Sequence, residues 1–147
     1  MATVFVAIDD SKFAENAFKC YAENFHRPGN KVVLLHVVEN LIDYRDMSPG
    51  RIIELQAEAK KEAQTLKEKF AAIAKQLGVE AEIRVEMAEK PAHAIVEMAN
   101  KEKATFIVTG SRGMGVVRRT ILGSTSDFIL HHAKCPVFIY KMENKNM

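Results

Sequence analysis

The stretch ATFIVTGSRGMGVVRRTILGSTSD, residues 104–127, contains a complete strand–loop–helix unit. Its first seven residues are apolar or β-branched and predict a buried strand that ends at Gly110. Ser124, with Asp127 three residues later, matches a capping box, so we expect a helix that begins there and runs to about His132. A buried strand, a glycine-bearing connection and a helix in this order are typical of an α/β protein.

The same alternation continues on both sides of this unit. Four further segments have the composition of strands, namely the buried runs 3–9 and 31–38, the alternating edge run 79–87 and the last run 137–142. Apolar residues at helical spacing predict helices in the intervening segments 11–25, 51–77 and 91–99. Five strands and four helices predict a three-layer, doubly wound α/β fold, in which helices cover both faces of a parallel sheet.

The long segment 51–77 fits two structures. Its apolar residues follow helical spacing, and 27 residues of helix extend about 40 Å. The same residues fit a heptad register, which would indicate a coiled coil. Because the segment covers fewer than four heptads and lies between two strands, we favour a helix that packs on the sheet.

Size, composition and charge exclude several classes of protein. The chain has 147 residues, of which 48% are hydrophobic and 27% charged, so we expect one folded domain over residues 1–147. Two cysteines are too few for a disulfide scaffold or a zinc site. A net charge of +2 argues against a nucleic-acid surface. We expect a cytoplasmic protein, since the sequence has neither a membrane-length apolar run nor a signal sequence.

The loop after the 104–110 strand has the composition of an anion-binding site. Glycine allows the backbone to approach a ligand, and a helix start offers unpaired N–H groups at the positive end of its dipole. Such a cradle is suited to phosphate. Of the three arginines in the segment, we expect Arg112 to contact phosphate, and interpret Arg118 and Arg119 as loop surface.

Three better-known motifs do not fit this loop. A Walker A sequence would need Gly-Lys-Ser or Gly-Lys-Thr at residues 115–117, which are Gly-Val-Val. A dinucleotide fingerprint would follow the first strand, where residues 8–13 contain no glycine. A nucleophile elbow would need glycine in place of Thr109. The predicted cradle is therefore of another type.

The spacing Gly110-x2-Gly113-x9-Gly123-Ser124 resembles the nucleotide-binding pattern of the universal stress proteins of the ATP-binding class. The resemblance covers essentially the whole chain, because four further stretches fall where that family has its counterparts. These stretches are VAIDDS (6–11), LLHVVE (34–39), IVTGSRG (107–113) and CPVFIYK (135–141). The resemblance implies a Rossmann-like fold with strand order 3-2-1-4-5 and an adenine nucleotide, ATP or else AMP or ADP, across the carboxyl edge of the sheet.

The resemblance also implies roles for individual residues. Asp9 and the backbone of Val37 would lie at the adenine end of the nucleotide. The positions implied to approach the ribose and phosphates are Gly110, Arg112 and Gly113, and those implied to hold the phosphate chain are Gly123, Ser124 and Thr125. The family typically forms dimers through its last strand, here Pro136 to Met142, so a homodimer is expected.

One segment departs from the family pattern. Many members carry Gly-x-Pro after the third strand, whereas this chain has Glu89-Lys90-Pro91. The side chain of Glu89 would narrow that side of the cleft.

We therefore predict an ATP-binding, stress-response regulatory protein that acts as a nucleotide-dependent dimeric switch, with Mg²⁺ bridging the phosphates and the 111–122 loop ordered by ATP. The sequence between Gly110 and Ser126 contains no Asp, Glu or His that could act as a catalytic base. The alternative is a slow ATPase or an adenylate hydrolase, in which Asp9 or Asp127 places a metal ion or water. A third possibility is a flavodoxin-like mononucleotide binder.

Three residues outside the loop need interpretation, and two of them, Asp9 and Tyr44, allow two interpretations each. Asp9 either contacts adenosine or helps to cap the first helix. His36 lies inside a buried run and is interpreted as a hydrogen-bonded core histidine. Tyr44 either covers the site or belongs to a surface loop.

Overall fold

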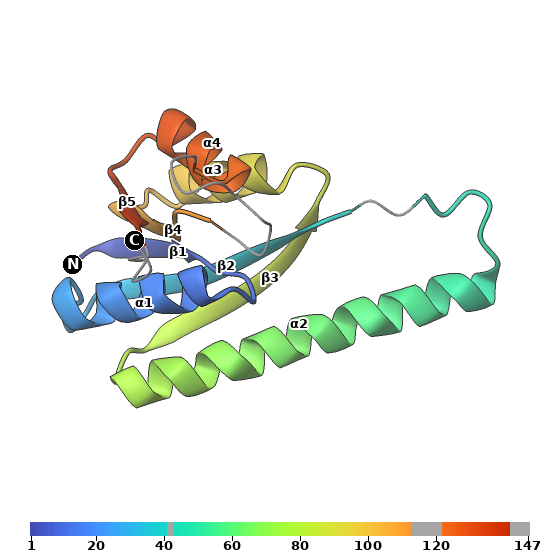
Figure 1. The fold of residues 1–147 in the computed structure, drawn as a ribbon, viewed down its shortest axis with the longest axis horizontal. Coiled ribbons are helices and arrows are strands. Elements are labelled where there is room, and N and C mark those ends of the chain that lie inside the picture. Colours follow the sequence, from blue (N-terminus) through green and yellow to red (C-terminus); the bar gives the residue numbers. More distant parts are fainter. Residues whose placement is uncertain (41–42, 113–121, 142–147) are drawn as a thin grey trace, which may run out of the picture.

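The computed structural model describes residues 1–40, 43–112 and 122–141. The strands are β1 (Thr3–Ala7), β2 (Lys31–Glu39), β3 (Ala81–Ala88), β4 (Phe106–Gly110) and β5 (Val137–Tyr140). The helices are α1 (Lys12–Asn24), α2 (Pro49–Leu77), α3 (Pro91–Lys101) and α4 (Ser124–His132). Strands and helices alternate along the chain as the sequence predicts (Figure 1).

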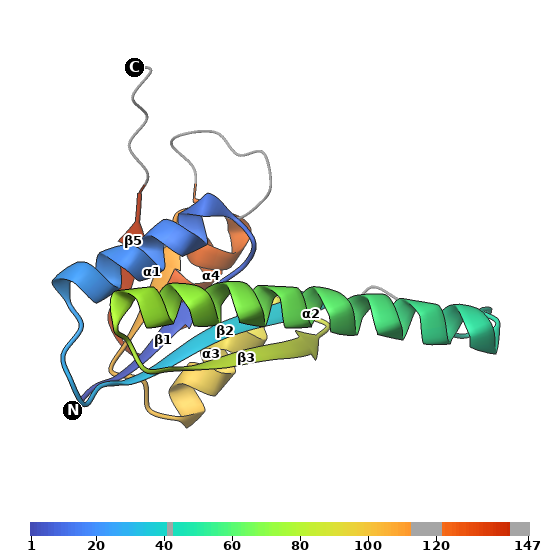
Figure 2. The ribbon, with the colours of Figure 1, turned by 90° about the horizontal axis from the view of Figure 1, so that it is seen from below.

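The sheet has five parallel strands in the order β3-β2-β1-β4-β5. This confirms the expected α/β fold and its strand order 3-2-1-4-5. Figures 1 and 2 show α1 and α2 on one face of the sheet and α3 and α4 on the other. The alternating strand β3 lies at one edge, where its charged side chains can face solvent.

Strand β1 supplies side chains to both faces of the sheet. Val4 and Val6 pack in the core beneath α1 and α2, whereas Phe5 packs in the core beneath α3 and α4. All three are fully buried, because successive side chains of a strand point to opposite faces and helices cover each face. A central strand of this kind is apolar along its whole length.

Strand β1 ends two residues earlier than predicted, at Ala7 instead of Asp9. The Asp9 carboxylate accepts a hydrogen bond from the backbone N–H of Ser11, at 2.8 Å. Asp and Asn often make such local bonds, which turn the chain out of an extended conformation. The turn leads directly into α1, whose N-cap is Ser11.

Helix α2 is anchored on the sheet only by its C-terminal part, residues 66–77. Its buried residues are Leu66, Phe70, Ile73 and Ala74. Residues 49–65, which we call the α2 arm, contain no buried residue. The N-terminal part of this arm extends beyond the sheet (Figures 1 and 2). Packing on the sheet is therefore confirmed over the last part of the predicted helix only.

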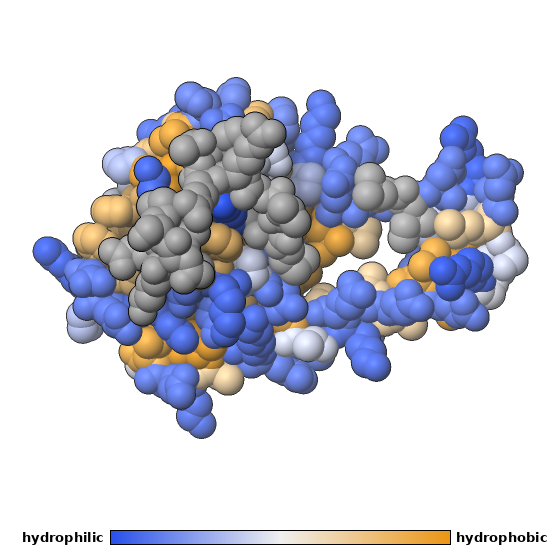
Figure 3. Space-filling view, in the orientation of Figure 1, coloured by the Kyte–Doolittle hydropathy of each residue, from blue (hydrophilic) through white to orange (hydrophobic). Residues whose placement is uncertain are grey.

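The ends of α2 follow from its capping residues. Ser48 is the N-cap and accepts a hydrogen bond from the Arg51 N–H at 3.2 Å, and Pro49 follows in the first turn, so the helix begins two residues before the predicted start. Gly78 ends the helix in the left-handed conformation, with φ of 69°. Hydrophilic side chains cover most of the visible surface of the α2 arm (Figure 3). Among the described residues, no helix combines the length and apolar character of a membrane span.

Candidate functional site

A cavity of about 300 Å³ opens at the carboxyl ends of the strands. It lies where the chain leaves β1 toward one face of the sheet and β4 toward the other, which is where parallel α/β sheets commonly bind ligands. Its lining residues are Ala7, Ile8, Asp9, Ala14, His36, Val37, Pro91, Ile95, Thr109, Gly110, Arg112, Gly123, Ser124, Thr125 and Ser126.

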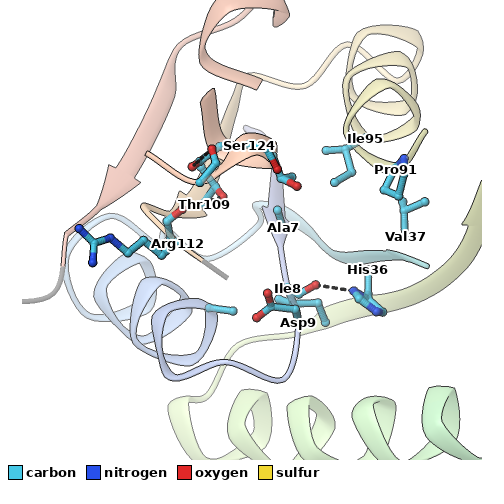
Figure 4. A pocket seen from close by; sticks show the side chains of 15 residues that line it. Ala7, Ile8, Asp9, His36, Val37, Pro91, Ile95, Thr109, Arg112 and Ser124 are labelled. Carbon is cyan, nitrogen blue, oxygen red and sulfur yellow. Dashed lines mark hydrogen bonds between the residues drawn. The ribbon is translucent and has the colours of Figure 1, made fainter. Parts of the chain in front are cut away.

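The cavity has an apolar wall and a polar wall. Figure 4 shows Val37, Pro91 and Ile95 on one side, where the end of β2 meets the start of α3. Thr109, Arg112 and Ser124 lie on the other side, where β4 ends and α4 begins. One site can therefore hold a ligand with an apolar, flat end and an anionic end.

The structure brings most of the predicted site residues together around this cavity. The lining includes Asp9, Val37, Gly110, Arg112, Gly123, Ser124 and Thr125. The eighth predicted residue, Gly113, and the arginines Arg118 and Arg119 lie outside the described residues. These positions come from four separate parts of the chain, so their proximity is a consequence of the fold.

The start of α4 is not capped by a side chain. Its N-cap is Gly123, which has no side chain to accept a hydrogen bond, and Ser124 is the first helical residue. The predicted capping box at Ser124 is therefore wrong by one residue. The reason is tertiary: the Gly123 N–H donates to the Ser111 carbonyl at 2.8 Å, which holds Gly123 just before the helix.

Backbone N–H groups remain available at this helix start. The first of them to bond along the helix is that of Asp127, which donates to the Gly123 carbonyl at 2.9 Å. Within the part of the chain that the structure describes, the N–H groups of Ser124 and Thr125 have no acceptor. They carry the positive end of the helix dipole, so this end of the cavity favours an anion.

The two described glycines of the cavity have different surroundings. A Cβ at Gly110 would lie 2.9 Å from the Cβ of Phe13 and 3.1 Å from its carbonyl carbon. A Cβ at Gly123 would meet nothing closer than 3.5 Å. Packing therefore requires glycine at residue 110, whereas the described neighbours of residue 123 leave space for a side chain.

Asp9 forms part of the cavity floor and also holds the turn after β1. Its carboxylate accepts the Ser11 N–H, and the Ser11 hydroxyl in turn accepts the Ala14 N–H at 3.2 Å. Ser11, and not Asp9, is thus the residue that caps α1. A carboxylate with one backbone donor can still accept hydrogen bonds from a ligand.

His36 has the hydrogen-bond partner that the sequence predicts for a core histidine. Its Nδ1 donates to the Ile8 carbonyl at 2.8 Å and so links the ends of β1 and β2. The structure adds a position that sequence reasoning missed, because His36 also lines the cavity. The sequence feature that could have indicated this role is the position of His36 next to Val37, at the carboxyl end of a buried strand.

Two other segments contribute little to the cavity. Tyr44, for which the sequence left two interpretations open, lies in the connection to the α2 arm and is not among the cavity residues. Glu89 is exposed and also absent from the lining, so the expected narrowing of the cleft by its side chain is not observed. Of the Glu89-Lys90-Pro91 segment, only Pro91 reaches the cavity, as the first residue of α3.

Comparisons with known proteins identify the family. Residues 1–141 match the universal stress protein family, and the chain belongs to it. A universal stress protein from Thermus aquaticus, described as lying in the QAH/OAS sulfhydrylase 3′ region, is 32% identical over 144 residues, which are 95% of this chain and 98% of the relative. A putative universal stress protein from Staphylococcus aureus is 29% identical over 143 residues, 95% of this chain and 84% of the relative.

Solved structures share the fold. The universal stress protein UspA from Lactobacillus plantarum has a TM-score of 0.81 at 21% identity, with 95% of this chain and 97% of that chain covered. A universal stress protein family protein from Arabidopsis thaliana has a TM-score of 0.72 at 25% identity, with 99% and 95% covered, and its structure contains AMP.

Proposed function

We propose that this chain binds an adenine nucleotide in the cavity at the carboxyl edge of the sheet and acts as a stress-response regulatory protein. The observation that carries the proposal is the start of α4, where the N–H groups of Ser124 and Thr125 lack an acceptor among the described residues and line the cavity. The AMP held by the Arabidopsis thaliana relative supports an adenine nucleotide as the ligand class.

The two walls of the cavity suit the two ends of such a ligand. Val37, Pro91 and Ile95 would contact the flat base, with the Val37 backbone hydrogen-bonding its edge. The Asp9 carboxylate can accept a hydrogen bond from adenosine.

The phosphates would lie at the opposite, polar wall of the cavity. Gly110, Arg112 and Gly113 would approach the ribose and phosphates. The residues that would hold the phosphate chain are Gly123, Ser124 and Thr125. Backbone N–H groups, a helix dipole and a guanidinium are the groups that commonly hold phosphate.

ATP is the proposed physiological ligand, with AMP or ADP as the alternatives. Isothermal titration of the purified chain with ATP, ADP and AMP, each with and without Mg²⁺, measures and ranks their affinities. Mg²⁺ bound together with ATP would offset part of the negative charge of the phosphates. Lack of binding at millimolar nucleotide with Mg²⁺ would contradict the proposal.

The proposed regulatory output is a change in dimer contacts. Within the described residues β5 lies at an open edge of the sheet, and Phe138 on it is 40% exposed, so a second copy could pair along Pro136 to Met142. We propose that residues 1–147 act as one domain in the cytoplasm and dimerise through this strand. Light scattering of the wild type and of Phe138→Glu, with and without ATP, tests the assembly. An equal mass in all four samples would contradict a nucleotide-dependent dimer.

Slow hydrolysis is the second candidate function. It is favoured by one observation, the Asp9 carboxylate in the cavity wall, which could orient a water molecule. Asp127, the other carboxylate considered, does not line the cavity. A steady-state ATPase assay with Asp9→Asn beside the wild type separates the two functions. Turnover well below about 0.1 per second would indicate binding alone, because enzymes typically run at about 1–1,000 per second.

A further inference from the structure

Lys69 of α2 connects this helix to the turn that carries Asp9. Its Nζ lies 2.8 Å from Oδ1 of Asp10 and 3.7 Å from Oε2 of Glu15. Lys69 and Asp10 are 59 residues apart in sequence, so the contact depends on how α2 docks beside α1. The Lys69 ammonium, hydrogen-bonded to Asp10, holds the pKa of that carboxyl below its ordinary value.

Lys69 lies near the start of the anchored part of α2. It lies between the buried residues Leu66 and Phe70, at the point where the helix becomes anchored on the sheet. N-terminal to Leu66 the helix is the α2 arm, without buried residues. The contact between Lys69 and Asp10 is therefore made close to the junction between the anchored part of α2 and the arm.

The turn on the other side of this contact belongs to the cavity. Asp9 lines the cavity, whereas the neighbouring Asp10 faces α2 and binds Lys69. The hydrogen bond from the Ser11 N–H to Asp9 makes the turn compact. Because the two residues are consecutive in this turn, a shift of the Asp10 backbone would also shift the backbone that carries Asp9.

Charge gives Lys69 a second effect on the same site. Asp9, Asp10 and Glu15 place three carboxylates in residues 9–15, of which only Asp9 lines the cavity. A polyanionic ligand is repelled by these groups, and Lys69 offsets two of them directly. The loss of this cation would disfavour a phosphate-bearing ligand more than a neutral one.

We propose that Lys69 is a positioning residue of the cavity, which holds the Asp9 turn through Asp10 and couples occupancy of the cavity to the α2 arm. The inference rests on the proposed nucleotide binding. Lys69 itself does not line the cavity, so we expect it to act without touching the ligand.

The first test measures nucleotide affinity in four proteins by isothermal titration at low salt. Lys69→Met should bind the nucleotide that the wild type binds roughly two- to fivefold more weakly, the range expected for loss of a partly exposed ion pair. Lys69→Arg should restore the wild-type affinity. Lys60→Met, an exposed lysine of the arm, is the matched control and should leave affinity unchanged. The deficit of Lys69→Met should shrink at high salt, where exposed charges are screened.

A double-mutant cycle tests whether Lys69 affects nucleotide binding through Asp10. Asp10→Asn removes the Asp10 charge and its ion pair with Lys69 but keeps the Lys69–Glu15 contact, so it should weaken binding less than Lys69→Met does. The losses should not add in the double variant, because both substitutions break the same ion pair. Additive losses would overturn the proposal, as would a Lys69→Met variant that is less stable to urea but binds with unchanged affinity.

Amide hydrogen exchange tests the coupling to the arm. Nucleotide should change the exchange of residues 49–65 in the wild type and not in Lys69→Met. Equal changes in both proteins would overturn the coupling. A wild type that binds no adenine nucleotide contradicts the proposed function and this inference together, whereas normal binding with an unaffected Lys69→Met contradicts this inference alone.

Discussion

Gly110 lies against the backbone of Phe13, so closely that a Cβ on residue 110 would be 3.1 Å from both the carbonyl carbon and the carbonyl oxygen of Phe13. The first turn of α1 can thus rest on the end of β4 only because residue 110 has no side chain. This approach brings the turn at Asp9 next to the start of the glycine loop. Gly110, which we expected to approach a ligand, is therefore also needed for the packing of α1 against β4.

Replacement of Gly110 by alanine should destabilise the protein. The added methyl group meets backbone atoms, which cannot move as a flexible side chain would, so we expect the free energy of unfolding to fall by about 1–3 kcal/mol. Urea unfolding followed by circular dichroism measures the change. Gly50→Ala is the control: its Cβ meets nothing within 4 Å, and the substitution should be neutral or stabilising in the arm of α2. A Gly110→Ala variant as stable as the wild type would contradict the close packing.

Gly123→Asp should change stability and nucleotide binding in opposite directions. Gly123 has φ of −61° and ψ of 155°, a conformation open to any residue, and aspartate there can accept the unpaired N–H groups of α4. We expect a gain in unfolding free energy of a few tenths to about 1 kcal/mol. Binding of a phosphate-bearing ligand should weaken by at least about tenfold, because the carboxylate occupies and repels the anion site.

Gly123→Ala separates the charge of that aspartate from its size. The described surroundings have room for the Cβ, so the variant should fold with nearly wild-type stability. Its nucleotide affinity should fall between those of the wild type and of Gly123→Asp. If Gly123→Asp bound nucleotide as tightly as the wild type, the start of α4 would not be the phosphate site.

The two parts of α2 should respond differently to truncation of apolar side chains. Phe70 is fully buried in the core beneath α1 and α2, and Phe70→Ala should cost about 3–5 kcal/mol of unfolding free energy. Ile53 in the arm is 66% exposed, and Ile53→Ala should change stability by less than about 0.5 kcal/mol. Amide exchange in the wild type should likewise be faster over residues 49–62 than over 66–77. A large loss for Ile53→Ala would show that the arm is packed in solution.

Acid should weaken an ion pair between β3 and the C-cap residue of α3. Arg84 of β3 donates to both carboxylate oxygens of Glu102, at 2.5 and 2.9 Å. These hydrogen bonds hold the pKa of the Glu102 carboxyl below its ordinary value. A carboxyl whose pKa is lower in the folded protein stabilises the fold at neutral pH. That stabilisation is lost as the pH falls below about 4.3, the ordinary pKa of glutamate.

Glu102→Gln should therefore lower stability by about 1 kcal/mol at pH 7 and by progressively less toward pH 3. Urea unfolding at several pH values gives the difference between the two proteins. Glu97→Gln, an exposed position on α3, is the control and should show no such convergence. A Glu102→Gln deficit that is constant over this pH range would rule out the ion pair as its cause.

The order of strands and helices was predictable because each strand carries its own signal. Strands covered on both faces, such as β1 and β2, read as unbroken apolar runs, and the edge strand β3 reads as an alternation of apolar and charged residues. Carboxyl ends of parallel strands share one edge, so Asp9, Val37 and Gly110 could be expected near one another. Their assignment to nucleotide depends on resemblance and stays a prediction.

The apolar wall of the cavity could not be predicted in the same way. Pro91 and Ile95 have the spacing of any buried helix face, and only the distance between α3 and the end of β2 makes them a cavity wall. The N-cap of α4 was misplaced for a similar reason. The motif that begins at Ser124 fits a helix start, but a long-range hydrogen bond from the Gly123 N–H to Ser111 decides where the helix begins.

The sequence alone determined the alternation of strands and helices, the family, and the place of the glycine-rich loop, because these depend on residue patterns within single segments. Only the tertiary structure decided that Gly110 is required by Phe13, that Lys69 binds Asp10, and that the first part of α2 leaves the sheet. Each of these depends on where separate segments meet, since a contact between distant residues is set by the packing of whole elements and not by the local pattern of either one.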